Sequence, residues 1–249
     1  MLSKQKELVK SYLGKTVDIK IDRPLGSIHH EYKNIIYPVN YGCIPNEFVG
    51  DNEKIDVYLI GVNEPVKEFR AKIIGIIHRK NDIKDKLVAA PDGMIFNQAE
   101  IQKAVHFEKQ YFDTEVETIY WKSCGAIVYR ETEQGKEYLL LYQNQSKTWS
   151  FPKGRMKMGE SEIQTATREI FEETGIKVEL DPNTREEITV TYPDKSQKTI
   201  VFFLKNTNAK PLIDKKEIIE YRYFKAEEAK KLLPKQYVKL IDDMESNND

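Results

Sequence analysis

The sequence predicts a two-domain protein of the α+β class, and three observations support this fold class. The first part of the chain contains short apolar runs separated by Gly, Pro and aromatic residues, a spacing typical of a small β-barrel or sheet. A polar stretch at 113–118 then interrupts the core-forming pattern. Beyond it, strand-like runs resume around an amphipathic helix at 161–175. The predicted domains are therefore residues 1–116 and 117–249.

Composition limits the classes of function. The chain of 249 residues is 40% hydrophobic and 32% charged, which is typical of a folded, soluble protein. A net charge of −1 gives no basic surplus, so neither DNA nor an anionic membrane is an expected partner. Only two cysteines occur, Cys43 and Cys124, and no apolar leader precedes the first strand, so we expect a cytoplasmic protein. No apolar run approaches ~18 residues, so no membrane span is expected.

The first domain is expected to be built mainly from strands. Its strand-like runs are 17–21, 35–39, 55–60, 71–79 and 86–91. One helix is expected over 97–112, where apolar residues recur at helical spacing and Asn97 can cap the first turn.

The second domain mixes strands with helices. Its strand-like runs are 123–130, 137–143, 188–192, 199–204 and 220–224, and one or two helices are expected over 226–233 and 235–244. Ser161 can cap the amphipathic helix and Gly175 can end it, because glycine accepts left-handed dihedrals without steric cost. Ile163, Ala166 and Ile170 share one face of that helix and can pack on a sheet.

The other face of the same helix is strongly acidic. Glu169 and Glu173 are four residues apart and Glu172 is three from Glu169, so the carboxylates share an arc of roughly a hundred degrees. Like charges this close repel unless a cation lies among them. Arg168 can pair with Glu172 but cannot neutralise all three acids. The cluster is either a solvated charged face or a metal site.

The spacing around the helix favours the metal site. The chain fits G-x5-E-x7-R-E-U-x-E-E-x-G-U, with U a bulky aliphatic residue, at every fixed position. The matching residues are Gly154, Glu160, Arg168, Glu169, Ile170, Glu172, Glu173, Gly175 and Ile176. By average residue usage, a chance match is on the order of one in ten million. This motif is the Nudix box, and the chain resembles the Nudix hydrolases. The resemblance implies an α/β/α sandwich with a mixed sheet, and magnesium-dependent cleavage of a nucleoside diphosphate linked to another group.

The resemblance also implies roles for the box residues. Glu172 and Glu173 match the main metal ligands, assisted by a backbone carbonyl near Gly154. Glu169 matches a further ligand or the general base, and Glu160 an outer ligand. Such hard oxygen donors suit Mg²⁺, with Mn²⁺ as an alternative ion. Bound metal lowers the pKa of a coordinated water and neutralises phosphoryl charge. Which acid takes the proton stays open.

Stretches outside the box narrow the resemblance. SCGAIVYR, TWSFPKGRMKMGE and KTIVFFL look most like the asymmetrical diadenosine tetraphosphate hydrolases. Lys153 would present its charge to a phosphate, Glu217 stands where this subgroup supplies another acid, and Phe202 stands where it often has a tyrosine that stacks on adenine. The simpler alternatives are a surface lysine, an exposed glutamate and a core aromatic. The catalytic candidates are Arg168, Glu169, Glu173 and Glu217.

A second resemblance lies in the first domain. The stretch YPVNYGCIPNEFVGDNEKID resembles the family I inorganic pyrophosphatases, whose pattern pairs YPxNYG with an acidic D-x-D-x-x-D cluster. Tyr37 and Tyr41 match the tyrosines that bind substrate. Asp51 and Asp56 match the outer metal-binding aspartates, and Glu53 replaces the central one.

A second acidic segment of that family matches after a short deletion. Asp82 and Asp85 are the counterparts of metal ligands and Lys86 of a phosphate-binding residue. His29 and His30 stand near positions where the family has phosphate-binding basic residues. The first domain either binds or cleaves pyrophosphate, or it is an inactive barrel kept for packing or dimerisation. A homo-oligomer is therefore left open.

The two resemblances together give three functional hypotheses. The first choice is Mg²⁺-dependent hydrolysis of a nucleoside polyphosphate, with a dinucleoside tetraphosphate as substrate. That reaction gives a triphosphate and a monophosphate, so it leaves no pyrophosphate for the first domain. One alternative is therefore a nucleoside triphosphate pyrophosphohydrolase coupled to a pyrophosphatase. The other is a nucleotide sensor whose first domain has lost activity.

Overall fold

The computed structural model describes residues 2–29, 32–49, 53–79, 85–109, 114–213 and 215–246. The chain divides into two compact units. Unit 1 comprises Met1–Trp121 and Thr191–Gln197, and unit 2 comprises Lys122–Val190 and Lys198–Asp249. Within the described ranges, none of the helices has the length and apolar character that a membrane span requires.

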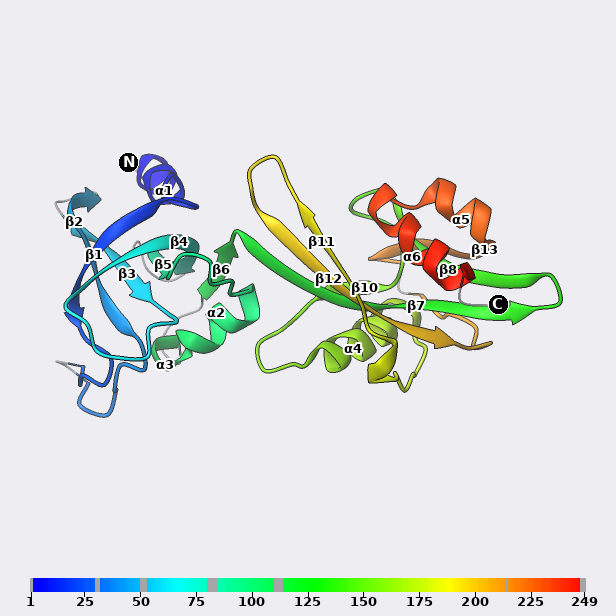
Figure 1. The fold of residues 1–249 in the computed structure, drawn as a ribbon, viewed down its shortest axis with the longest axis horizontal. Coiled ribbons are helices and arrows are strands. Elements are labelled where there is room, and N and C mark those ends of the chain that lie inside the picture. The colour runs from blue at the N-terminus through cyan, green and yellow to red at the C-terminus, as the bar shows by residue number, and fades with distance from the viewer. Residues whose placement is uncertain are drawn as a thin grey trace. The chain divides into compact units, whose positions relative to one another are not determined.

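Unit 1 contains a closed five-stranded barrel (Figure 1). Its strands are β1 (Thr16–Arg23), β2 (Asn40–Val49), β3 (Glu53–Leu59), β4 (Glu68–Arg79) and β5 (Lys86–Ala90). They follow the order β1-β2-β3-β5-β4, and β4 pairs back with β1. The β3–β5 pair is parallel, whereas β4 runs antiparallel to both β1 and β5. This closure confirms the predicted barrel.

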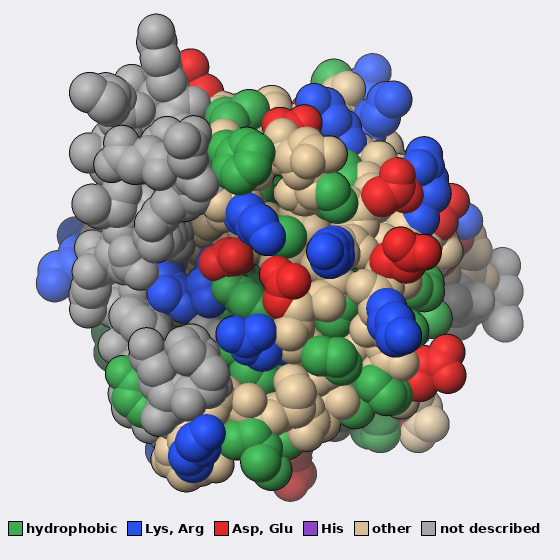
Figure 2. Space-filling model, turned by 90° about the vertical axis from the view of Figure 1, so that its left-hand side faces the viewer, with side chains coloured by type: hydrophobic (Ala, Val, Ile, Leu, Met, Phe, Trp, Pro, Cys, Tyr) green, Lys and Arg blue, Asp and Glu red, His purple; other side chains and the backbone are tan. Residues whose placement is uncertain are grey.

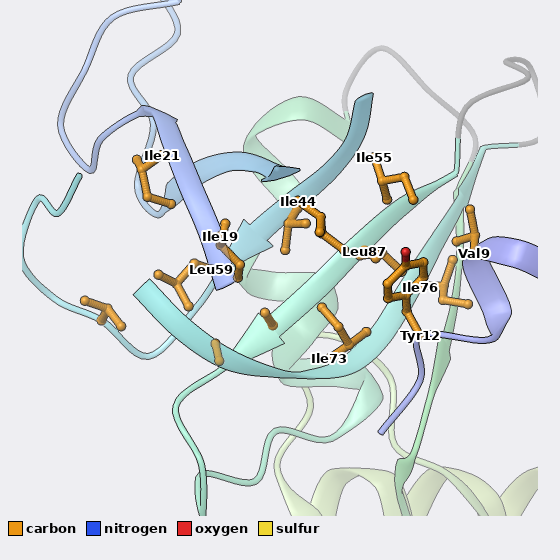
Figure 3. Packing of buried hydrophobic residues seen from close by; sticks show 14 residues of the cluster. Val9, Tyr12, Ile19, Ile21, Ile44, Ile55, Leu59, Ile73, Ile76 and Leu87 are labelled. Atoms are coloured by element: carbon orange, nitrogen blue, oxygen red, sulfur yellow. The ribbon is translucent and has the colours of Figure 1, made fainter. Parts of the chain in front are cut away.

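Alternating apolar residues fill the barrel. Ile19 and Ile21 of β1 are buried while the residues beside them are exposed, which is the period of a half-buried strand. Figure 3 shows Ile19, Leu59 and Ile73 inside the barrel, with Val9 and Tyr12 beside Ile76 at one end. Val9 belongs to α1 (Leu2–Lys10), a helix that the sequence analysis did not predict.

The segment after β5 forms two short helices, α2 (Gln98–Ala104) and α3 (His106–Lys109). Asn97 caps α2 as predicted: its side chain accepts hydrogen bonds from Ala99 N at 2.9 Å and Glu100 N at 3.2 Å. Glu100 completes the capping box, because its carboxylate accepts from Asn97 N at 2.8 Å. The end of the predicted helix, 110–112, lies outside the described residues.

Two sequence predictions in unit 1 were wrong. The run 35–39 forms only an isolated bridge between Ile28 and Ile36, and β2 begins later, at Asn40. Pro38 has no N–H to continue a ladder, and the N–H of Tyr37 bonds to Ser27 O at 2.9 Å.

The polar stretch at 113–118, predicted to lack a core pattern, instead contains β6 (Thr114–Thr118), which pairs antiparallel with β4. An edge strand buries only alternate residues, here Val116 and Thr118, so its sequence reads as polar.

Unit 2 is organised around a seven-stranded mixed sheet. Its strands are β7 (Tyr120–Thr132), β8 (Gly135–Gln143), β9 (Trp149–Ser150), β10 (Lys153–Arg155), β11 (Glu186–Thr191), β12 (Gln197–Asn206) and β13 (Ile218–Lys225). The main path is β11-β12-β7-β8-β13, with β10 paired to β7 and β9 paired to β8. A 3₁₀ turn at Pro182–Thr184 precedes β11.

Helices cover both faces of this sheet (Figure 1). Helix α4 (Glu162–Thr174) packs through Ile170 on Val128 and Leu139. Helices α5 (Ala226–Leu232) and α6 (Lys235–Ser246) cover the neighbouring residues of the same strands, including Ile127 and Leu140. Because consecutive residues of a strand point to opposite faces, this alternation places α4 on one side and α5 with α6 on the other. The predicted α/β/α sandwich is confirmed.

Candidate active site

The helix α4 is fixed at both ends by its own sequence. Ser161 accepts a hydrogen bond from Gln164 N at 3.2 Å, and Gln164 returns one by accepting from Ser161 N at 2.8 Å. At the other end, Gly175 has φ 67° and donates its N–H to Phe171 O at 2.8 Å. Both predicted caps are confirmed. With Ile170 buried against the sheet, the acidic face of α4 is turned toward β10.

Gly154 lies at the closest approach between α4 and β10. It pairs with Cys124 of β7, which brings β10 alongside the helix. A Cβ atom at position 154 would lie 2.1 Å from Cδ of Glu169. Only glycine therefore allows the Glu169 carboxyl group to lie against this backbone.

Glu173 is the most buried acid of the helix, with 6% of its surface exposed. Its carboxylate accepts hydrogen bonds from the Lys153 N–H at 2.9 Å and from the Gln143 side-chain amide at 3.1 Å. Burial raises the pKa of Glu173 to about 7, against the opposing effects of the Gln143 hydrogen bond and the Lys153 charge. A carboxyl group that titrates near neutrality can exchange protons at physiological pH.

Glu169 and Glu172 converge on one guanidinium nitrogen. Nη1 of Arg168 donates to Glu169 and also to Glu172, the latter at 2.9 Å. Burial raises the pKa of Glu169, although the Arg168 hydrogen bond acts in the opposite direction. Glu172 is far more open to solvent. Glu169, Glu172 and Glu173 together form the acid cluster.

The remaining nitrogens of Arg168 bind Glu160. Nε lies 2.6 Å and Nη2 lies 2.8 Å from its carboxylate, a bidentate arrangement, and Nη2 also donates to Arg155 O at 3.0 Å. The Arg168 hydrogen bonds lower the pKa of Glu160 to about 2. Arg168 thus links Glu160, the β10 backbone and two members of the acid cluster.

Basic side chains lie beside the acid cluster. Burial lowers the pKa of Lys153, although the charges of Glu173 and Glu169 oppose that shift. Burial, together with the charges of Lys153 and Arg155, lowers the pKa of Lys198 to about 8. The sequence analysis missed Lys198, because only the sheet order, with β12 next to β7, brings it near β10. These cations give the site a means to bind phosphate.

The site contains the donor type that a divalent ion requires. Carboxylate oxygens are hard ligands, and a bound cation would offset part of the desolvation cost of the half-buried Glu169 and the buried Glu173. Among the described residues, no group of three or more Asp, Glu, His or Cys side chains stands in metal-ligating positions. The guanidinium group of Arg168 forms ion pairs with both Glu169 and Glu172. The acid cluster therefore fits a metal by its chemistry, and binding requires these carboxylates to turn from Arg168.

Besides Lys153, two further site residues were predicted outside the box, Glu217 and Phe202, and their surroundings differ. Glu217 is exposed just before β13, and its carbonyl oxygen accepts from Asn144 N at 2.8 Å, next to the Gln143 that binds Glu173. Phe202 is 0% exposed and packs edge-on against Phe151 and Tyr237. The ring of Phe202 therefore belongs to the core, which favours the alternative of a core aromatic over stacking on adenine.

In unit 1, the predicted substrate-binding residues do lie together. The ring centroids of Tyr37 and Tyr41 are 5.6 Å apart, and Nζ of the buried Lys86 lies 4.6 Å from the Tyr41 ring centroid. His29 stacks on Tyr37 at 5.8 Å. Basic and acidic side chains are interspersed over the face of unit 1 that Figure 2 shows.

Two of the predicted acidic residues of unit 1, Asp56 and Asp85, have described side chains. Asp85 binds Nδ1 of His78 at 2.8 Å, and the Nε2 of that ring lies 3.1 Å from Glu117. The Asp85 hydrogen bond is the main cause of a raised pKa at His78. Asp56 lies in β3, opposite Cys43 of β2. Three predicted residues and one predicted side chain fall outside the described part of the chain: His30, Asp51 and Asp82, and the side chain of Glu53.

Comparisons with known proteins also match the two parts of the chain to two families. Residues 120–244 match the family model described as NUDIX domain, and residues 10–120 match the model described as inorganic pyrophosphatase. The asymmetrical bis(5'-nucleosyl)-tetraphosphatase of Sus scrofa is 34% identical over 93 residues, covering 33% of this chain and 63% of that protein. Soluble inorganic pyrophosphatase 1 of Arabidopsis thaliana is 38% identical over 80 residues, covering 30% of this chain and 34% of that protein.

The chain thus spans about a third of the length of the curated pyrophosphatases that it matches (34% for the Arabidopsis protein). Among solved structures, a binary complex of the C. elegans Ap4A hydrolase aligns with a TM-score of 0.46 at 24% identity, covering 51% of this chain and 96% of that one. The family match spans half of the chain and includes the whole acid cluster. The chain therefore belongs to the NUDIX family, and its Nudix domain follows an inorganic pyrophosphatase-like domain.

Proposed function

We propose that unit 2 hydrolyses a phosphoric anhydride bond of a nucleoside polyphosphate, with a dinucleoside tetraphosphate as the first choice of substrate. The buried Glu173 carries this proposal. Its carboxylate has two hydrogen-bond donors, a pKa near neutrality and a second, half-buried acid, Glu169, on the same face of α4. Buried acids with shifted pKa values gather at catalytic sites more often than elsewhere.

We assign the acid cluster the task of holding Mg²⁺ or Mn²⁺, with Glu160 in an outer position and the Gly154 carbonyl as a further donor. When bound, such an ion would neutralise charge on the phosphoryl oxygens and lower the pKa of its coordinated water. Lys153 and Lys198 contact phosphate oxygens of the substrate. Arg168 is a positioning residue, because it fixes Glu160, Glu169 and Glu172 relative to the β10 backbone.

Two acids qualify as the general base. Glu169 and Glu173 both have raised pKa values from burial, so each holds a proton more readily than an exposed carboxylate. Glu217 stays a candidate for an additional acid, because its backbone lies at the Gln143–Asn144 turn beside the site.

For unit 1 we propose binding of pyrophosphate or a related small phosphate. The supporting observation is the grouping of Tyr37, Tyr41 and the buried Lys86. The contact between Asp85 and the His78 ring favours the alternative of an inactive barrel, because it occupies a carboxylate that a metal would need. A domain boundary near residue 116, a cytoplasmic location and homo-oligomer formation remain proposals from the sequence.

Product chromatography on the full chain with Mg²⁺ tests the hydrolase proposal. The substrates are diadenosine tetraphosphate, nucleoside triphosphates and pyrophosphate, each offered to the wild type and to Glu173→Gln. We expect a triphosphate and a monophosphate from diadenosine tetraphosphate, and a loss of roughly 10²–10⁴-fold in Glu173→Gln. Glu179→Gln, an exposed acid just beyond α4, is the matched control.

The outcomes separate the hypotheses. Near wild-type turnover in Glu173→Gln would remove the acid cluster from the mechanism. Release of pyrophosphate from a nucleoside triphosphate, with little cleavage of the tetraphosphate, would favour the coupled pyrophosphohydrolase. Nucleotide binding without any cleavage would favour the sensor.

A further inference from the structure

Unit 1 contains a pocket of about 590 Å³ beside α2, within the range of roughly 300–1,000 Å³ that is usual for small-molecule sites. We call it the α2 pocket. Its apolar lining is Pro38, Val39, Ile60, Met94, Phe96 and Ala104. The lining includes none of Tyr37, Tyr41 and Lys86, so the α2 pocket is distinct from the predicted pyrophosphate site.

One wall of the α2 pocket is the segment after β3, and a buried side chain fixes it. Asn40, which is fully buried, accepts hydrogen bonds from Leu25 N at 3.0 Å and Val66 N at 3.2 Å. Its amide donates to Glu64 O at 2.9 Å. A wall that is already ordered costs a ligand less entropy on binding.

The other wall is held equally firmly. The capping box of Asn97 and Glu100 fixes the start of α2. Gly61 has φ 80°, and a Cβ atom built there would lie 2.9 Å from Sδ of Met94 and 3.1 Å from the Phe96 ring. Glycine at position 61 therefore leaves room for the thioether and the ring, which a larger side chain there would displace.

The lining indicates the chemistry of the ligand. A thioether and an aromatic ring are good contacts for a flat ring, and Met94 is 44% exposed although it lies at the pocket. At the rim stand Asn63, Glu100 and Lys103. An aliphatic chain would use none of the hydrogen-bonding capacity of Asn63 and Glu100, whereas the edge of a nucleobase offers both donors and acceptors.

Lys103 supplies the positive charge. Its side chain is exposed, and within the described ranges it has no acidic partner. An ammonium group at the mouth of an apolar pocket can bind the phosphate of a ligand whose ring enters the pocket. We propose that the α2 pocket binds a nucleoside monophosphate, with the base against Met94 and Phe96 and the phosphate at Lys103. The proposal stands whether or not unit 2 is a hydrolase.

The test uses methyl NMR of the full chain labelled with ¹³C-methyl methionine, in EDTA. The Met94 signal is assigned by its loss in Met94→Leu. Adenosine 5'-monophosphate should shift the Met94 signal in a saturable manner, since a base stacked there adds a ring current. Met244, buried in unit 2, should not move. Ribose 5-phosphate, which lacks the base, and hexanoate, which lacks the aromatic ring, should leave Met94 unshifted.

Two variants of exposed rim residues complete the test. Lys103→Ala and Asn63→Ala should each weaken the Met94 response at least about tenfold, as expected for loss of a charged or bidentate contact. Lys67→Ala, an exposed lysine of unit 1 outside the pocket, should leave it unchanged. The proposal fails if the nucleotide moves only Met156 and Met158 of unit 2, if hexanoate shifts Met94 as strongly as the nucleotide, or if Lys103→Ala binds normally.

Discussion

Glu173 of unit 2 and Asp85 of unit 1 are both poorly exposed carboxylates that the sequence marks as metal ligands, yet their surroundings differ. Glu173 accepts hydrogen bonds from an amide N–H and a side-chain amide, both neutral donors. Asp85 instead lies 2.8 Å from the ring of His78. Burial raises the pKa of the Glu173 carboxyl group, whereas in unit 1 the hydrogen bond to Asp85 raises the pKa of the His78 imidazole.

The difference shows what keeps a buried acid available for a ligand. An acid with neutral partners retains an uncompensated desolvation cost, and a cationic ligand can relieve it. An acid that already has a cationic partner gains less from a metal and must first give up that partner. We therefore expect the chemistry in unit 2 and a weaker phosphate or nucleotide response in unit 1.

After the loss of turnover expected for Glu173→Gln, the next largest effect is expected from Gly154→Ala. The added Cβ would lie 2.1 Å from Cδ of Glu169, so the carboxyl group must move by about an ångström or more. A displacement of that size costs roughly a hundredfold in turnover. Steady-state kinetics with diadenosine tetraphosphate, with circular dichroism to confirm folding, measures it. A folded variant with wild-type turnover would show that the position of Glu169 is irrelevant to the reaction.

The second prediction concerns stability and pH. The folded-state pKa of Glu173, about 7, lies above the ordinary value of 4.5, so folding favours the neutral acid. The stability that this group contributes is present at low pH and is lost as the pH rises from 4.5 through about 7. Glu173→Gln, which is neutral at every pH, should therefore be more stable than the wild type at high pH, by on the order of 3 kcal/mol.

Urea unfolding in EDTA from about pH 4 to about pH 8.5 measures this difference, which should vanish at the acidic end. Glu179→Gln should follow the wild type throughout. If Glu173→Gln instead loses stability at high pH, the Lys153 charge outweighs the burial of the carboxylate, and the contrast with Asp85 disappears.

The features that the sequence predicted correctly depend on residues close together in the chain. Helix α4 was predicted with both ends, because its caps, Ser161 and Gly175, act within a few residues of the chain. The residues of the Nudix box could also be predicted, because their spacing involves only helix α4 and the loop before it. Glu160, Arg168 and Glu169 accordingly lie together.

Features set by strand order or register could not be predicted in this way. Gln143 and Lys198 reach the site only because β8 and β12 both lie beside β7. The pairing of His78 with Asp85 depends on β4 lying next to β5. Phe202 was considered for substrate binding because the resembling subgroup often has a tyrosine at that position, and alternation along a strand does not show which side is core.

A third prediction tests Arg168 as a positioning residue. Lysine cannot provide the forked donors that hold Glu160, so Arg168→Lys should lower kcat by about tenfold, with a smaller change in KM. Arg185→Lys is the matched control, since Arg185 binds Glu162 and Glu187 away from the acid cluster. An equal loss of kcat in both variants would mean that Arg168 only stabilises the fold.

The smallest expected effect is in unit 1. The raised pKa of His78 means that its stabilising contribution is present below the ordinary pKa of 6.5 and is lost as the pH rises through the raised value. His78→Gln should therefore cost about 1 kcal/mol near pH 6 and less at alkaline pH. Thermal unfolding at both values measures the change. Hydrolysis by unit 2 should be unaffected, and a large loss of turnover would contradict the division of roles between the units.

Metal binding tests the central claim most directly. Mn²⁺ is titrated into the full chain in the presence of a non-hydrolysable nucleotide, with electron paramagnetic resonance to count bound ions, for the wild type, Glu173→Gln and Asp85→Asn. We predict that Glu173→Gln weakens Mn²⁺ binding at least about tenfold, because a carboxylate ligand is lost, and that Asp85→Asn leaves that site intact. Unchanged Mn²⁺ binding in Glu173→Gln, or binding abolished by Asp85→Asn alone, would contradict a metal-dependent hydrolase centred on the acid cluster.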